Sequence, residues 1–214
     1  MGGMMSMMEH PHNMSDISPI WVPEFFAQAI VVNGKTWPVL NIEPRRYRFR
    51  LLNGCNSRFL ILKLVAGDPT QRPGIPALPF WQIGAEQSFL PAPVQLGQLL
   101  IAPAERADVI VDFSGLTPGT ELYLINEGPD EPFGGGIPGL DFAFADPQTT
   151  GQVMKFVVGP LLSTDTSVPP ASLQLPRIPK LGPPDNVRQV SLNEQDSATV
   201  RVVTDEAGNV VLCL

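Results

Sequence analysis

Short apolar segments recur along most of the chain, and their spacing is that of β-strands. The clearest case is 46–53, where Tyr47, Phe49 and Leu51 alternate with arginines. Alternation with a period of two places one set of side chains on each face of a strand. We therefore predict a strand here with one buried face and one arginine-rich face that meets water or carboxylates.

Two pairs of segments are predicted to form hairpins. The apolar run 26–32 ends at an Asn33-Gly34 pair, and a second run follows at 37–42, which is the pattern of two strands joined by a tight turn. The segments 106–113 and 121–126 also alternate and are separated by a glycine-containing turn. They predict a second hairpin.

The other apolar segments are short, and proline or glycine separates them. Because 59–65 is apolar at nearly every position, it predicts a strand that is buried on both faces. The stretches 66–79 and 127–152 are predicted to be surface loops. Further strands are predicted at 80–83, 99–102, 153–158, 187–192, 199–203 and 210–214. With 24 prolines and 19 glycines as punctuation, this pattern favours an all-β fold.

Proline also marks a break in the organisation of the chain. Between 159 and 184 it is frequent and alternation is almost absent, which is typical of an extended linker. The strands that follow are too few to enclose a core, so we expect the rest of their domain to be missing or supplied by a partner. The predicted organisation is a flexible leader at 1–16, a β domain at 17–160, a linker at 161–186 and a partial second β domain at 187–214.

Charge and hydropathy exclude several functions. The net charge is -7 and lysine and arginine form no cluster, which argues against nucleic acid and anionic membranes as partners. No apolar run approaches the roughly 20 residues that span a bilayer. The N-terminus lacks the features of a signal peptide. Cys55 and Cys213 cannot distinguish an oxidising compartment from a reducing one, so the localisation stays open. A disulfide between them is the less favoured outcome, and the geometry of the fold decides it.

Imidazole is scarce, which limits metal chemistry. The sequence has 2 histidines, and both His10 and His12 lie in the leader. Their spacing places both rings on one side of an extended segment, and Met7, Met8 and Met14 add sulfur donors, so weak copper scavenging is conceivable. Because the leader offers no preorganised geometry, we expect a flexible segment rather than a functional metal site.

No catalytic or cofactor-binding residue is predicted. Histidine-based catalysis is excluded for the core because the sequence has no histidine after His12. Cys55 lies in a turn without a nearby histidine and is predicted to be a packing thiol. Asp108 and Asp112 share one face of a strand, where salt links to Arg48 or Arg50 are expected rather than a catalytic carboxylate pair.

Several motifs in a fixed order resemble the second domain of bacterial multicopper oxidases such as bilirubin oxidase, spore-coat laccase and phenoxazinone synthase. The matching segments are 32–38, 43–53, 56–58, 83–84, 89–91 and 101–113. The same residues also have a structural interpretation that needs no family. The Asn33-Gly34 pair sets a turn, Pro44 opens a strand, and Glu105 can tie a strand start to the arginine-rich face.

The resemblance implies a cupredoxin-like Greek-key β-barrel or sandwich at 17–160 and the first strands of a third cupredoxin domain at 187–214. In that family the first and third domains carry the coppers, and the intact protein oxidises phenolic-type donors and reduces dioxygen to water. The chain would then be the copper-free bridging domain, inactive alone, with the first and third domains as its partners. None of the matching residues is a copper ligand.

An alternative class of function stays open at this point. The chain could be a free-standing binding or scaffold module that contacts a partner through the 127–152 loop or the C-terminal strands. The C-terminal strands could also pair with those of a second copy of the chain. Flanking coding sequence with His-x-His pairs upstream and a His-Cys-His element downstream would favour the oxidase. A stop codon after Leu214 would favour the module.

Overall fold

The computed structural model describes residues 24–191, 202–204 and 210–213. β-strands are the main element, and Pro170–Ser172 forms the one short 3-10 helix of this described part. The structure is therefore nearly all-sheet, as the sequence predicts.

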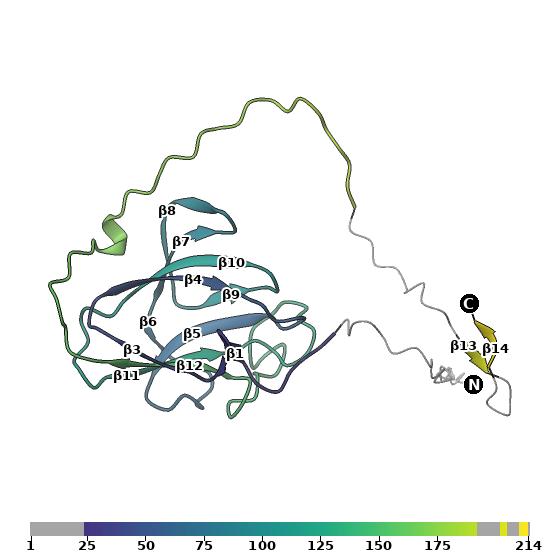
Figure 1. Cartoon of the computed structure of the whole chain (residues 1–214), viewed down its shortest axis with the longest axis horizontal. Coiled ribbons are helices and arrows are strands. Elements are labelled where there is room, and N and C mark those ends of the chain that lie inside the picture. The colour runs from purple at the N-terminus through teal and green to yellow at the C-terminus, as the bar shows by residue number, and fades with distance from the viewer. Residues whose placement is uncertain (1–23, 192–201, 205–209, 214) are drawn as a thin grey trace. The chain divides into compact units, whose positions relative to one another are not determined.

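Two sheets form the body of the protein, and Figure 1 shows β4 and β10 in one layer and β5, β11 and β12 in the other. The first sheet has four strands in the order β4 (Arg46–Leu52), β10 (Arg106–Asp112), β7 (Phe80–Ala85) and β8 (Ser88–Leu96). The second has the order β3 (Val39–Ile42), β12 (Gln152–Val158), β11 (Glu121–Asn126), β5 (Leu60–Ala66) and β6 (Pro76–Leu78), with β9 (Leu99–Ile101) also paired to β5.

The core lies between these sheets, and the alternating face of β4 contributes to it as predicted. Tyr47, Phe49 and Leu51 pack against the buried cluster. The rings of Phe49 and Phe113 meet edge to face, with centroids 6.5 Å apart, and Phe156 lies 5.8 Å from Phe49. Phe113 is fully buried. Burial of these aromatic side chains is a major source of stability, because each removes a large apolar area from water.

The first predicted hairpin exists, but its second strand is different. Asn33 and Gly34 both have positive φ (49° and 83°), which is the geometry of a two-residue turn, and they join β1 (Val31–Val32) to β2 (Lys35–Thr36). The predicted pairing with 37–42 is wrong. A further positive φ of 46° at Trp37 redirects the chain, and β3 instead pairs in parallel with β12.

The second predicted hairpin is wrong. β10 belongs to the four-stranded sheet and β11 to the six-stranded sheet, so the chain crosses from one layer to the other between them. Phe113 sits at this crossing, where its backbone N–H donates to the Arg45 carbonyl. Alternation shows that both segments are strands, but it does not show which sheet each one joins.

Two strands that the hydrophobic pattern does not predict contain proline. β6 begins at Pro76, inside the predicted loop 66–79, and β8 contains Pro91 and Pro93. Both strands lie at the edge of their sheets. Proline is tolerated there because an edge strand has one side on which no N–H donor is needed.

The predicted surface loop 127–152 is buried at both ends. Glu127 is 1% exposed at its start and Ala145 is fully buried near its end. In between, the Phe133 ring packs on Phe59 with centroids 4.9 Å apart and on Phe142 at 5.5 Å. Only the middle of the loop is exposed to solvent, as the composition of the whole loop predicts.

The region after β12 is only partly strand. β13 (Val202–Thr204) and β14 (Val210–Cys213) form an antiparallel hairpin. The described part of the predicted strand 187–192 is not a strand, and Val187 and Val190 are each 85% exposed. One compact unit extends to Lys180, and Asp165 still contacts Arg46 at 3.5 Å.

Candidate interaction site at the edge of strand β4

Strand β4 has one paired and one unpaired edge within the described residues. On the paired side, the N–H of Asn53 donates to Glu105 at 3.1 Å and the carbonyl of Arg45 accepts from Phe113 at 3.2 Å. Backbone groups of successive residues in a strand point to opposite sides. The N–H and C=O groups of the even-numbered residues therefore face the free edge. These residues are Arg46, Arg48, Arg50 and Leu52.

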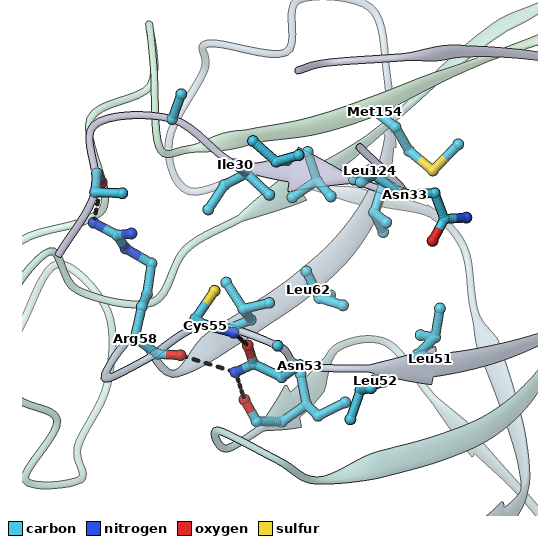
Figure 2. Close-up of a pocket in the computed structure, with 18 of the residues that line it drawn as sticks. Ile30, Asn33, Leu51, Leu52, Asn53, Cys55, Arg58, Leu62, Leu124 and Met154 are labelled. Carbon is cyan, nitrogen blue, oxygen red and sulfur yellow. Dashed lines mark hydrogen bonds between the residues drawn. The ribbon is translucent and has the colours of Figure 1, made fainter. Parts of the chain in front are cut away.

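An apolar cavity of about 720 Å³ opens between this edge and the segment 27–33. Figure 2 shows Ile30 on one side of this cavity and Leu51 on the other, with Leu62 between them, and Leu124 also lines it. Leu62 and Leu124 belong to the six-stranded sheet, so the cavity reaches the space between the two layers. The sandwich is thus open along β4.

A second cavity of about 650 Å³ lies on the outer face of the same strand end. Its walls are charged: Arg48 is paired with Asp108, and Arg106 lies 2.5 Å from Glu86. The Arg48 guanidinium also lies 5.6 Å from the centre of the Phe89 ring, which is cation–π range. The turn between β7 and β8 therefore folds over the end of β4 and makes a concave surface.

The arginines on the outer face of β4 differ in their partners. Asp108 binds Arg48, in line with the expectation from the sequence, whereas Asp112 binds Arg46 at 2.7 Å. Among the described residues, no ion pair or hydrogen bond engages the side chain of Arg50, which lines both cavities. The two carboxylates are thus held by arginines in a structural role, whereas the Arg50 guanidinium has no partner in the part of the chain that the structure describes.

The turn after β4 forms one end of the apolar cavity. The Asn53 amide donates to the carbonyls of Arg58 (2.8 Å) and Ile101 (3.0 Å), and its oxygen accepts from the N–H of Cys55 (3.0 Å), as Figure 2 shows. Asn53 is 1% exposed, so these bonds satisfy polar groups that burial would otherwise leave unpaired. Its role is to fix the turn.

Arg58 joins the turn after β4 to the segment 27–33, and the sequence indicated it only as part of the matching segment 56–58, with no role of its own. Its side chain is 3% exposed, pairs with Asp130 at 3.0 Å and donates to the carbonyl of Ala27 at 2.8 Å. The guanidinium also lies 5.5 Å from the Phe26 ring. Because its partners are 31 and 72 positions away, no local pattern indicates this role.

Cys55 is a free thiol that is half-buried beside the apolar cavity. Burial raises the pKa of the Cys55 thiol, and the charge of Arg58 offsets this only in part. A thiol that resists deprotonation is a poor nucleophile and a poor metal ligand. This environment fits the packing role predicted for Cys55.

The two candidate metal ligands, His10 and His12, lie outside the described residues, as do Met7, Met8 and Met14. Within 24–191 and the C-terminal hairpin, no group of three or more histidine, cysteine, aspartate or glutamate side chains is placed to hold a metal ion. That same part of the chain contains no helix with the length and apolar character needed to cross a bilayer.

Curated relatives match this chain over most of its length. Multicopper oxidase LPR1 homolog 1 from Oryza sativa subsp. japonica is 41% identical over 158 residues, which are 74% of this chain and 24% of the relative. The laccase of Bacillus subtilis (strain 168) is 37% identical and covers 73% of this chain. The bilirubin oxidase of Albifimbria verrucaria is 37% identical and covers 70%. No family model matches the chain.

A solved structure agrees with these relatives. The crystal structure of the McoA multicopper oxidase from the hyperthermophile Aquifex aeolicus is similar with a TM-score of 0.56 and 28% identity. The match covers 76% of this chain and 32% of that one. The chain spans about a quarter of the length of the curated relatives it matches.

Proposed function

The chain is related to the multicopper oxidases over most of its length, and we propose that it is the copper-free middle domain of such an oxidase. In this role the cupredoxin-like barrel bridges a first and a third cupredoxin domain, which carry the coppers. The hairpin β13–β14 would be the start of the third domain. The chain alone would not oxidise substrates.

One observation carries the proposal: the related oxidases are copper proteins, but this barrel lacks the side chains that a blue copper site requires. A blue copper site takes two imidazoles, a cysteine thiolate and usually a weak axial methionine. The sequence has no histidine from Asn13 to Leu214, so Cys55 has no imidazole beside it with which to form such a site. The residues of the barrel therefore do not fit copper, and no redox step passes through them.

The activity of the intact protein belongs to the same proposal. An oxidase of this type would take electrons from phenolic-type donors and reduce dioxygen to water, with the metal bound by parts of the protein other than this barrel. The relatives support this because they are named laccase, bilirubin oxidase and multicopper oxidase and are about four times longer than the matched segment.

Copper titration of the full 214-residue chain tests the proposal. We expect no intense blue charge-transfer band after addition of Cu(II) and no oxidation of a phenolic substrate, with an intact laccase as the positive control. The His10→Ala/His12→Ala double variant serves as the matched control for weak binding by the leader. Stoichiometric copper that survives dialysis in this double variant would contradict the proposal.

A further inference from the structure

We infer that the free edge of β4 accepts an extended peptide segment as an added strand, and that apolar and acidic side chains alternate along this segment. The inference goes beyond the bridging role and does not rest on it, since it involves neither copper nor oxidation. It assigns a binding surface to this chain and a chemistry to the partner.

The backbone of β4 provides the first part of the site. β4 is seven residues long, and its alternate N–H and C=O groups face away from β10. Unpaired edge groups of this kind are a template for another strand, because main-chain hydrogen bonds form with little dependence on sequence. The length of β4 is enough to hold a short strand in one register.

The two cavities provide the second part, because they open on opposite faces of the same edge. Arg50, Leu51 and Leu52 line both of them. Successive side chains of an added strand point to opposite faces. One set would enter the apolar cavity, toward Leu62 and Leu124, and the other set would enter the charged cavity.

The charged cavity favours acidic side chains in the set of the added strand that enters it. Its lining has three arginines, Arg48, Arg50 and Arg106, and two carboxylates, Glu86 and Asp108, which leaves one positive charge (3 − 2 = 1). That surplus is notable in a chain with a net charge of -7. Arg48 and Arg106 are paired within the chain, so the carboxylate of a ligand would meet Arg50. A guanidinium binds a carboxylate through two parallel hydrogen bonds.

The same charges disfavour a second copy of this chain as the partner. Antiparallel pairing of two β4 edges about a twofold axis centred on Arg48 would place Arg46 of one copy opposite Arg50 of the other. Like charges directly opposite each other on neighbouring strands destabilise the pair. A strand with acidic residues on this face meets no such repulsion.

A designed peptide tests the inference with the full chain. The probe is a capped peptide of alternating valine and glutamate as long as β4, seven residues. Its binding is measured by calorimetric titration, and amide chemical shifts identify the contact surface. We expect binding with shifts along β4. A valine–lysine peptide, and a valine–glutamate peptide with N-methyl groups on the edge-facing amides, should bind at least about tenfold more weakly.

Two variants locate the contact. Arg50→Glu should weaken binding of the acidic peptide at least about tenfold. Arg177→Glu makes the same charge change in the exposed segment after β12 and should leave the affinity unchanged. Circular dichroism checks that both variants fold.

Four results would overturn the inference: equal binding of the acidic and basic peptides, no loss on N-methylation, no effect of Arg50→Glu, and absence of binding at about millimolar peptide. Dimers of the chain whose contact surface, located by amide chemical shifts, is the β4 edge would show that a second copy occupies the edge instead. None of these results depends on copper content, so failure here leaves the proposed bridging role standing, and the reverse also holds.

Discussion

The ammonium of Lys63 lies 2.6 Å from a carboxylate oxygen of Glu127 inside the wall of the six-stranded sheet, where Glu127 is 1% exposed and Lys63 is 12% exposed. The two atoms are at ion-pair distance, although their alignment does not make a hydrogen bond. The other oxygen of Glu127 accepts from the N–H of Gly74 at 2.5 Å. One carboxylate therefore joins β5, the end of β11 and the loop that precedes β6.

Removal of Glu127 is predicted to destabilise the fold strongly. Glu127→Ala leaves the Lys63 ammonium without its buried counter-ion and the Gly74 N–H without its acceptor. Breaking a buried ion pair from one side typically costs about 3–5 kcal/mol. Urea unfolding followed by fluorescence measures this loss in the free energy of unfolding.

The matched control is Glu121→Ala, which breaks the exposed pair between Glu121 and Lys155. Exposed pairs contribute little, because water and salt screen the charges. We expect little change in the urea midpoint of this control. If both variants lose the same free energy of unfolding, burial does not strengthen the Lys63–Glu127 pair.

The sequence predicts the strands better than it predicts their partners. Local alternation identifies β4, and Tyr47 and Phe49 face the core as expected. The ion pair of Lys63 with Glu127 is not predictable in this way, because Lys63 interrupts an apolar run and its partner lies 64 positions further on. The sheet that each strand joins also depends on long-range packing, which explains the error at β10 and β11.

The candidate site shows the same division. The arginine-rich face of β4 and its pairing with Asp108 follow from the period of two. That β4 is an edge strand among the described residues does not follow from this period, because an edge strand is defined by how the other strands pair. That no described residue pairs with the Arg50 side chain likewise depends on Asp108, which lies opposite Arg50 in the strand register but binds Arg48 instead.

Stability is predicted to fall in acid through the Arg46–Asp112 pair. Burial alone would raise the pKa of the Asp112 carboxyl, but hydrogen bonds from Ser114 and Arg46 outweigh it and hold the pKa below its ordinary value. A pKa that is lower in the folded state than in the unfolded state gives stability that is present above the unfolded value. That stability is lost as the pH falls through the folded value.

The Asp112→Asn variant isolates this contribution. At pH 6 we expect it to be about 1 kcal/mol less stable than the wild-type chain. The difference should narrow as the pH falls below the ordinary aspartate pKa of about 4 and close once the pH is below the lower pKa of the folded state. Urea unfolding at several pH values measures the difference, with Asp185→Asn in the exposed segment as the control. A difference that stays constant down to pH 2 would contradict the assignment.

Cys55 is predicted to react slowly in the folded chain. Its raised thiol pKa and partial burial both reduce the amount of accessible thiolate, which is the reactive form. In a Cys213→Ser background, an aromatic disulfide reagent at pH 8 should react at least about tenfold more slowly with the folded chain than with the urea-unfolded chain. Equal rates would show that the thiol is freely accessible, and a copper-ligand role would then need to be reconsidered.

A side chain at Gly84 is predicted to disturb both β7 and the charged cavity. A Cβ atom at this position would lie 2.8 Å from the Ser88 carbonyl oxygen and 3.2 Å from the Cβ of Asp108, at an irregularity in the pairing of β7 with β8. Because a backbone oxygen cannot rotate away, Gly84→Ala should cost about 1–3 kcal/mol in the free energy of unfolding. Gly115→Ala is the control, since nothing lies within 4 Å of its Cβ position. If the two variants unfold at the same urea concentration, the close approach of Ser88 to β7 is not a constraint on the fold.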